Sequence, residues 1–376
     1  MDKCIIASDS FKGSLSSIDI CNIFEEEYKK IFPLGQLIKI PIADGGEGSV
    51  FCFSQFLKGR IEKIVVKDAY FNDISASYLL TNDNVAVIEA SSCAGLSLFK
   101  NNDVKNASTI GIGTQIRNAI NKGAKKIILC LGGSCSNDAG CGIFYELGAR
   151  FYDENNNSFI PTGITLNKIK RIDLSKLNEF IKGIKFISMC DVNNPFYGKN
   201  GASYVFARQK GADDLLIKEL DDNLKYFYFL ILKDYNVDIN INGSGAAGGI
   251  GGGSYFFLKA SLKKGIDTIL KLINFKKLLI GCDFIFTGEG RIDSQSFNGK
   301  VISGILKNAK IMNIPVIALT GCVNKNIDFK NDLNTIFTIN REIKSLNEAL
   351  LNAKDNYRLT IRNILKLIKI AEKKSI

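Results

Sequence analysis

The chain of 376 residues has 46% hydrophobic and 23% charged positions, which is typical of a globular protein long enough for two domains and excludes disordered and collagen-like classes. The formal net charge is +11, but the basic residues stand singly or in doublets rather than in a cluster. We therefore expect a solvated basic surface and no nucleic-acid partner. No apolar run approaches the roughly 20 residues that span a bilayer, so we expect no membrane segment.

Histidine is absent, which eliminates Ser-His-Asp and Cys-His mechanisms, histidine-bound zinc and an imidazole general base. Acid–base chemistry then falls to Asp, Glu, Lys, Tyr or Cys side chains. The ten cysteines lie far apart with no C-x-x-C pair, which indicates small buried hydrophobic residues rather than zinc ligands or disulfides. The N-terminus shows no signal-peptide pattern, and we expect a cytoplasmic protein.

Short apolar runs alternate with longer amphipathic stretches, and most junctions carry glycine, which predicts an α/β protein with mostly parallel strands. The expected elements in chain order are buried strands at 3–7 and 127–131, a hairpin at 151–159, a strand at 185–189, a polar loop at 238–243, buried strands at 284–287 and 316–320, and a basic amphipathic helix or helix pair at 345–374. In open α/β sheets ligands bind beyond the carboxyl ends of strands. The loops that follow these strands are therefore the expected site.

The segment GSGAAG at 243–248 satisfies the G-x-G-x-x-G pattern of dinucleotide-binding turns, and Asp267 follows at about the expected spacing. However, the preceding residues DININ are polar, where a first Rossmann strand would be apolar, and glycines continue through Gly253. We interpret the segment as a phosphate-contacting turn or as closely packed backbone, and the sequence does not separate the two. A nicotinamide dehydrogenase is the weaker alternative.

Phosphoryl transfer needs N–H groups and cations around the phosphates, carboxylates for Mg²⁺, and a group that receives or orients the acceptor proton. Neither the P-loop nor the protein-kinase motifs occur, but the loops after the expected strands contain each kind of part. Lys12 lies in such a loop beside Asp9 and Ser10, where a cation suits a phosphate or carboxylate. Asp44 and Glu47 flank a glycine pair, so their carboxylates can approach one cation or the substrate hydroxyls.

Two loops in the middle of the chain also carry candidate groups. The loop GGSCSNDAG at 132–140 places glycines, hydroxyls, an amide and Asp138 together, which is dense for a structural turn. Asp191 directly follows a strand-like run and precedes a turn with Pro195, where capping of the turn is its competing role.

The segment GEGRID at 288–293 holds Glu289, Arg291 and Asp293, and Lys300 follows a little further on. Arg291 can fork onto a carboxylate or phosphate, while Asp293 fixes it or binds metal. A surface salt-bridge cluster is the alternative, which the position at the end of a strand disfavours.

Seven segments in this order resemble type I glycerate kinases: DSFKGSLSS, PIADGGEGS, STIGIGTQI, LGGSCSNDAG, CDVNNPFYGKNGASYVFARQKGA, GSGAAGGIGGG and TGEGRIDSQSFNGK. The resemblance implies ATP with Mg²⁺, D-glycerate as acceptor, and phosphoglycerate as product, with 2-phosphoglycerate favoured over 3-phosphoglycerate. It also implies a flavodoxin-like α/β domain built from residues 1–65 and 280–376, an inserted α/β domain at 66–279, and an active site in the cleft.

The expected mechanism is direct in-line transfer, with Asp191 as the first choice and Asp293 as the second for the group that accepts or orients the glycerate hydroxyl. Lys12 and Arg291 would hold phosphates or the substrate carboxylate. The other expected substrate or phosphate contacts are Asp9, Ser10, Gly132, Gly133, Ser134, Asn137, Gly288, Glu289 and Lys300, and the metal or hydroxyl contacts are Asp44, Glu47 and Asp138. A kinase for another small hydroxy acid and a non-catalytic binding protein are the alternatives, and we expect a monomer or homodimer.

Overall fold

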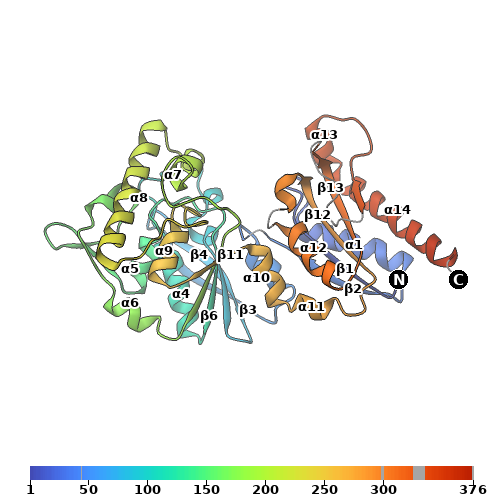
Figure 1. The fold of residues 1–376 in the computed structure, drawn as a ribbon, viewed down its shortest axis with the longest axis horizontal. Coiled ribbons are helices and arrows are strands. Elements are labelled where there is room, and N and C mark those ends of the chain that lie inside the picture. The colour runs from blue at the N-terminus through green and yellow to red at the C-terminus, as the bar shows by residue number, and fades with distance from the viewer. Residues whose placement is uncertain (44, 298–299, 325–334, 375–376) are drawn as a thin grey trace. The chain divides into compact units, whose positions relative to one another are not determined.

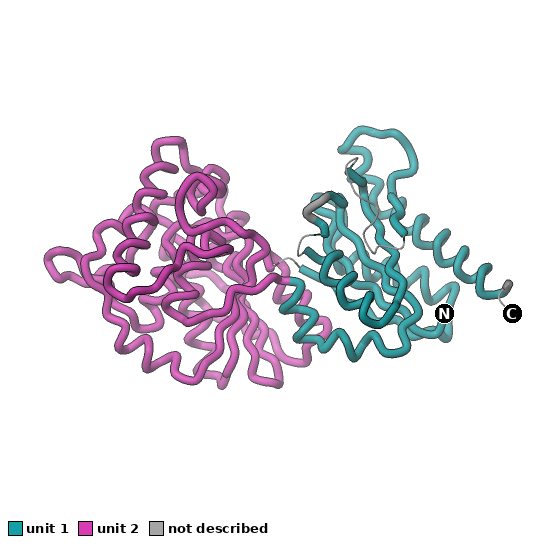
Figure 2. The backbone as a smooth tube through the Cα atoms, viewed as in Figure 1, with its two compact units in different colours: residues 1–44, 266–376 teal, residues 45–265 magenta. Residues whose placement is uncertain are grey.

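The chain forms two compact units, of which the first is discontinuous in sequence: it contains residues 1–44 and 266–376, and the second contains 45–265 (Figure 2). The structure is a computed structural model, and the residues it describes are 1–43, 45–297, 300–324 and 335–374. Each unit is an α/β assembly around its own sheet (Figure 1). No helix among these described residues is long and apolar enough to cross a membrane.

The first unit is built on five parallel strands in the order β14-β13-β12-β1-β2. The chain starts in the middle of this sheet, adds one strand on one side and then three on the other, which is the flavodoxin-like order. The strands are β1 Lys3–Ser8, β2 Gln36–Pro41, β12 Phe284–Ile292, β13 Val316–Val323 and β14 Thr335–Thr338. The runs predicted at 3–7, 284–287 and 316–320 are thus confirmed as neighbouring strands of one sheet.

Helices α1 and α14 pack together in the first unit and bury a shared core. Ser16 caps α1 in a capping box with Asp19, and the apolar side chains Ile20, Ile23 and Phe24 of this helix are buried. Glu27 of α1 accepts hydrogen bonds from Arg358 and Arg362 of α14. The helices of this unit are α1 Ser17–Ile31, α10 Gly265–Leu272, α11 Phe275–Leu278, η4 Ser294–Phe297, α12 Val301–Ile311, α13 Leu346–Leu351 and α14 Ala353–Lys374. The predicted C-terminal helix pair is confirmed.

The second unit contains a six-stranded mixed sheet in the order β11-β10-β6-β5-β4-β3. The first four strands in this order are parallel, and β4 and β3 join as an antiparallel hairpin. The strands are β3 Gly59–Lys67, β4 Asp73–Thr81, β5 Val85–Glu89, β6 Lys126–Cys130, β10 Lys185–Met189 and β11 Ser261–Lys263. A separate small sheet of β7 Arg150–Tyr152, β8 Ser158–Phe159 and β9 Arg171–Asp173 contains the predicted hairpin.

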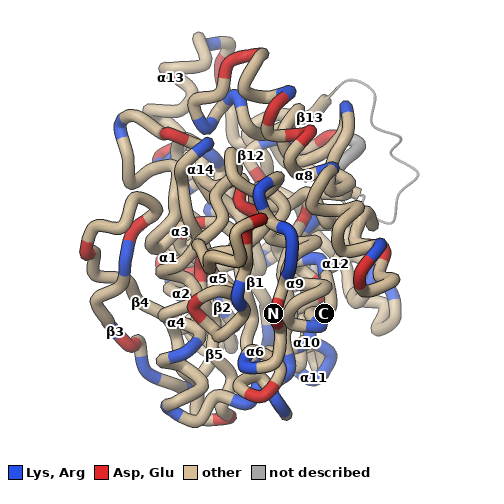
Figure 3. Tube along the Cα trace, turned by 90° about the vertical axis from the view of Figure 1, so that its left-hand side faces the viewer, with Lys and Arg blue, Asp and Glu red and all other residues tan. Residues whose placement is uncertain are grey.

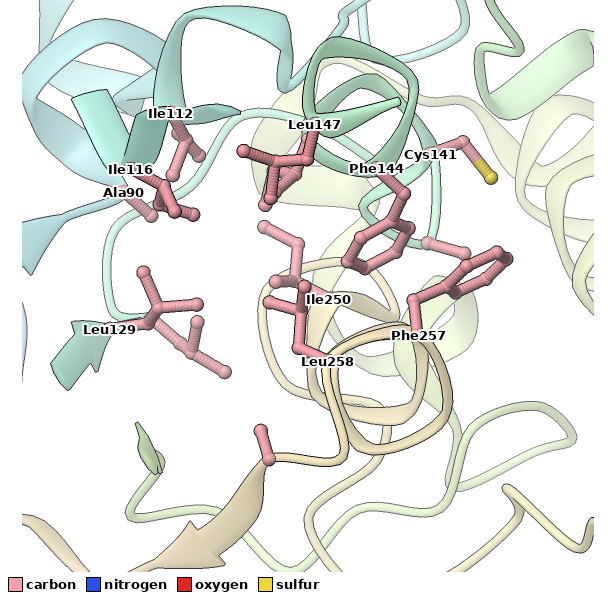
Figure 4. Packing of buried hydrophobic residues seen from close by; sticks show 14 of the residues in the cluster. Ala90, Ile112, Ile116, Leu129, Cys141, Phe144, Leu147, Ile250, Phe257 and Leu258 are labelled. Carbon is pink, nitrogen blue, oxygen red and sulfur yellow. The ribbon is translucent and has the colours of Figure 1, made fainter. Parts of the chain in front are cut away.

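Helices surround the mixed sheet of the second unit and enclose a large apolar core. Phe144 and Phe257 stack in this core with ring centroids 4.2 Å apart (Figure 4). The helices are α2 Ser49–Ser54, α3 Ser91–Ala94, η1 Leu96–Leu98, α4 Ile110–Asn121, α5 Cys141–Leu147, η2 Gly163–Lys168, α6 Ser175–Phe180, α7 Ala202–Phe206, η3 Arg208–Lys210, α8 Asp214–Tyr235 and α9 Ile250–Phe257.

The boundaries between the units fall at 44/45 and 265/266 rather than at the expected 65/66 and 279/280. Strand β3 pairs with β4 along its whole length, so the chain before residue 66 already belongs to the second sheet. At the other boundary, a Cβ added at Gly304 of α12 would overlap the side chain of Ile266. This close packing places the chain after residue 265 in the first unit.

Candidate active site

The loop after β6 in the second unit is shaped by close backbone contacts. The N–H of Gly132 donates to the carbonyl of Gly45 over 2.9 Å. A Cβ added at Gly132 would lie only 2.7 Å from the Cα of Gly46, so glycine is required for this approach. The predicted loops at 45–48 and 132–140 are therefore brought together within one unit.

This loop contains polar groups that have no hydrogen-bond partner among the described residues. Among the residues that the structure describes, no hydrogen bond uses the backbone N–H of Gly133, Ser134 or Asn137. The side-chain oxygen of Asn137 is also buried without a partner in that part of the chain. Buried polar groups are normally paired, and successive free N–H groups in a turn form a concave site for an anion. The predicted anion-binding role of this loop is consistent with its geometry.

The side chain of Asp138 lies in the interior of the second unit, whereas the sequence predicted a contact with a metal ion or with substrate hydroxyls. Its side chain is fully buried, and its oxygens accept hydrogen bonds from Thr109 through N at 2.9 Å and Oγ1 at 2.7 Å, and from the N–H groups of Gly140 and Gly142. Burial raises the pKa of Asp138, and these bonds oppose the shift. The carboxylate anchors the turn, and this geometry argues against the metal role suggested for it.

The loop from Gly45 to Val50 is held by a residue that the sequence analysis missed. Glu89, at the end of β5, accepts hydrogen bonds from the N–H of Gly48 and from that of Val50. Its burial raises its pKa. A carboxylate at the end of an apolar run, followed by Ala-Ser-Ser, was the signal that could have identified it.

Of the two acidic residues predicted in that loop, Glu47 is exposed and its Oε2 accepts a hydrogen bond from the Ser97 hydroxyl at 3.0 Å. Asp44 lies outside the described residues. Among the described residues, no group of three or more Cys, Asp or Glu side chains is arranged to hold a metal ion.

Asp191 lies just beyond the end of β10 and is half-buried. Its Oδ1 accepts a hydrogen bond from the backbone N–H of Gly265 at 2.8 Å. The prediction that this carboxylate follows a strand directly is confirmed. Its role in catalysis stays a prediction, beside its visible role of fixing the start of α10.

In the first unit, the loop after β1 lies against the loop that ends β12. The N–H of Asp9 donates to the carbonyl of Gly288 at 3.0 Å, and the N–H of Ser10 donates to the Asp9 carboxylate at 2.6 Å. A Cβ added at Gly290 would lie 3.3 Å from the backbone N of Lys12. The predicted DSFKG and GEGRID segments are therefore neighbours at the carboxyl edge of one sheet.

Charged side chains gather around Glu289 at this edge. Glu289 is buried, and its Oε1 has no hydrogen-bond partner among the described residues. Burial raises its pKa, as does the charge of Asp293, while a side-chain hydrogen bond with Ser296 and the charges of Lys300 and Lys12 lower it. Lys12 from the loop after β1 thus shares one electrostatic environment with Glu289, Asp293 and Lys300. Arg291 is exposed, and its backbone pairs with that of Cys322 in β13.

The glycine segment 243–249 is explained by packing. The N–H of Ala139 donates to the carbonyl of Gly248 at 3.1 Å, and a Cβ at Gly248 would overlap the Ser136 carbonyl. A Cβ at Gly253 would likewise overlap the Ala139 carbonyl. Of the two interpretations left open, close packing of backbone is the one that these contacts support. No strand precedes the segment, so it does not have the structure of a dinucleotide-binding turn.

Both units place glycine-rich and charged loops at the carboxyl ends of parallel strands, an arrangement typical of α/β proteins that bind small anionic ligands. A family model of the glycerate kinase family matches residues 4–369, and the chain belongs to this family. Lys, Arg, Asp and Glu are interspersed along the trace rather than gathered on one element (Figure 3).

Relatives match over nearly the whole chain. A glycerate kinase of Bacillus cereus is 40% identical, with 99% of each chain covered. The glycerate 2-kinase of Escherichia coli is 37% identical, with 96% of this chain and 97% of that protein covered. The crystal structure of a candidate glycerate kinase 2 from Salmonella typhimurium LT2 matches with a TM-score of 0.87 at 36% identity and covers 99% of both chains. The predicted fold class and family are thereby confirmed.

Proposed function

We propose that this protein transfers the γ-phosphoryl group of ATP to D-glycerate, with 2-phosphoglycerate as the favoured product. Membership of the glycerate kinase family supports the reaction class. The observation that supports placing a substrate-binding site in the loop after β6 is the set of unused N–H groups at Gly133, Ser134 and Asn137. These donors suit the oxygens of a phosphate or carboxylate, and both substrates carry such groups.

In the proposed step, a hydroxyl oxygen of glycerate forms a bond to the γ-phosphorus while the bond from that phosphorus to the β-γ bridging oxygen breaks and ADP leaves. The hydroxyl proton passes to a carboxylate, because the chain has no histidine. Asp191 is our first choice for this carboxylate and Asp293 our second. Neither assignment needs a covalent enzyme intermediate.

The charged group of the first unit suits the polyphosphate. Lys12 and Lys300 supply positive charge beside Glu289, and Arg291 is exposed at the same strand end. Mg²⁺ is the metal expected with ATP, and hard carboxylate oxygens are its ligands. The Glu289 oxygen that has no partner among the described residues and the neighbouring Asp293 have the right chemistry to hold it. When bound, the ion would neutralise charge on the phosphates.

We also propose that the protein works in the cytoplasm, where ATP is available, as a monomer or homodimer. Neither nucleic acid nor a membrane is required for the proposed reaction.

The direct test is to incubate the purified chain with Mg-ATP and D-glycerate and identify the product by phosphorus NMR. We expect ADP and a phosphomonoester at C2, with L-glycerate, glycerol and hydroxypyruvate turned over much more slowly. Glycerol is the informative control, since it lacks the carboxylate that the cationic groups are proposed to hold. Equal turnover of glycerol, or of tartronate or threonate in preference to glycerate, would contradict the substrate assignment.

A further inference from the structure

The segment 201–212 contains none of the residues predicted to bind substrate or to take part in catalysis. Two of its side chains nevertheless form hydrogen bonds with the loop after β6. The Nζ of Lys210 donates to the carbonyl of Ser136 at 2.6 Å. The Oγ of Ser203 accepts from the Nδ2 of Asn137 at 3.1 Å. Lys210 and Ser203 are buried, with 2% and 0% of their surface exposed. Two adjacent loop residues are thus held by two buried side chains of one segment.

Keeping a charged Lys210 at this position costs stability. Among the described residues, Lys210 has no ion pair, and the hydrogen bond from its Nζ to Ser136 is the one hydrogen bond that its side chain makes. Asp138, whose charge raises the pKa of Lys210, already accepts hydrogen bonds from the backbone N–H groups of Thr109 and Gly140. A buried ammonium without a carboxylate partner is unfavourable, and a neutral side chain of similar length would fill the same space at lower cost. Folding alone therefore does not explain a lysine here.

The hydrogen bond from Lys210 to the Ser136 carbonyl affects the chemistry of the loop. The carbonyl of Ser136 and the N–H of Asn137 belong to the same peptide group, and that N–H is among the unused donors. A cation bonded to the carbonyl withdraws electron density from the peptide and makes its N–H a stronger donor. The positive charge also acts over a short distance through a poorly polarisable interior.

We propose that Lys210 is a positioning residue for the anion-binding loop: it fixes and polarises the Ser136–Asn137 peptide so that the free N–H groups bind a phosphate or carboxylate of a substrate. This inference deepens the proposed function and depends on it for the identity of the anion. Ser203 fixes the neighbouring side chain of Asn137 from the same segment.

The charge state of Lys210 follows from its surroundings. Burial lowers the pKa of Lys210 to about 8, against an ordinary value of 10.5, while the charges of Cys135 and Asp138 oppose that shift. Burial raises the pKa of Cys135 to about 11, so this thiol is neutral at pH 7. On the segment itself, Arg208 is exposed and paired with Asp214.

The test compares Lys210→Met with Lys218→Met, which removes an exposed lysine of the neighbouring helix α8. At pH 7 we expect Lys210→Met to lower kcat/KM by about tenfold or more, with an unchanged or higher Tm. Lys218→Met should leave both unchanged. Wild-type kcat/KM should fall as pH rises through about 8, and this fall should be missing in Lys210→Met. Equal activity of Lys210→Met and wild type, or a variant that fails to fold, would overturn the proposal.

A second measurement does not depend on turnover. Amide hydrogen exchange of residues 132–140 should become faster in Lys210→Met without ligand, while the rest of the second unit keeps its wild-type protection. In Ser203→Ala, we expect faster exchange of the same residues, whereas kcat/KM should still fall above pH 8 as it does in the wild type. If the amide exchange rates of residues 132–140 were the same in Lys210→Met and in the wild type, the proposal would be overturned. If the wild type failed to phosphorylate glycerate, the proposed function would be wrong. The exchange measurement would still test whether Lys210 positions the loop.

Discussion

The carboxylate of Asp191 accepts a hydrogen bond from the backbone N–H of Gly265, with 2.8 Å between Oδ1 and N. Gly265 is the last residue of the second unit and the first of α10. The side chain that we propose as the proton acceptor therefore also fixes the backbone at Gly265. An asparagine can keep the hydrogen bond through its amide oxygen while it loses the charge and the basicity. The two roles can thus be separated by substitution.

We expect Asp191→Asn to fold normally and to lower kcat by on the order of 10²-fold or more, because a general base contributes about that much. Nucleotide affinity should change little, since the acceptor hydroxyl is the proposed partner. Steady-state kinetics and nucleotide titration measure both. If Asp191→Asn keeps near-normal kcat while Asp293→Asn is folded and inactive, the base lies in the other loop.

A second prediction concerns Glu89, which accepts from the N–H groups of Gly48 and Val50. Glutamine has the same shape but turns one acceptor into a donor that faces an N–H. We expect Glu89→Gln to lower the free energy of unfolding by about 1–3 kcal/mol and to reduce kcat/KM, because the loop that carries Glu47 shifts.

The control for Glu89 is Glu146→Gln, which removes a carboxylate paired with Arg117 near the surface of the same unit. A pair of this kind contributes little, so stability and activity should stay near those of the wild type. Urea unfolding and initial rates test both variants. Equal losses in the two variants would show that Glu89 has no special role in positioning the loop.

The fold was predictable to a large extent because its signals are local. Apolar runs followed by polar or glycine-containing loops identified β1, β12 and β13, and their parallel order follows from the α/β pattern. The boundary near residue 45 was not predictable, since it depends on pairing of β3 with β4 and on contacts of Gly132 with the loop before α2.

The sequence identified charged residues of the candidate site but not the role of each one. Charged residues in loops were found from their positions, yet the burial of Asp138 is decided by Thr109 and by two downstream N–H groups. The burial of Lys210 depends in the same way on Ser136, far away in sequence. Single-residue environments of this kind come from long-range packing, which a local pattern does not contain.

A third prediction concerns stability in acid. The side chain of Glu27 is only 1% exposed, and the pKa of Glu27 is lowered to about 2, chiefly by Arg362 and also by Lys30 and Arg358. The unfolded chain takes up this proton near pH 4.5. The stabilisation is therefore complete above about pH 4.5 and is lost as pH falls toward 2.

We expect Glu27→Gln to lower the free energy of unfolding by about 1–3 kcal/mol at pH 7 and to remove part of the dependence on pH below 5. Glu26→Gln is the matched control, because Glu26 is mostly exposed and pairs with Arg358 alone. Urea unfolding followed by circular dichroism between pH 3 and 7 gives both quantities. A larger loss from Glu26→Gln than from Glu27→Gln would contradict the assignment.

The last prediction concerns Glu289, whose buried oxygen has no partner among the described residues. Because burial raises its pKa, the native state keeps this proton in a pH window above 4.5, where the unfolded chain has lost it. The native state then binds more protons than the unfolded state, so the contribution of Glu289 to stability decreases as pH rises through that window. We expect Glu289→Gln to be at least as stable as the wild type at pH 7, with a difference between the two free energies of unfolding that grows from pH 4.5 upward. Activity should nevertheless fall by on the order of tenfold or more if the carboxylate faces Mg-ATP. Measuring unfolding and initial rates on both proteins across pH 4.5–8 separates these effects. A variant that is less stable than the wild type at pH 7 and still fully active would show that Glu289 is retained for the fold rather than for the substrate.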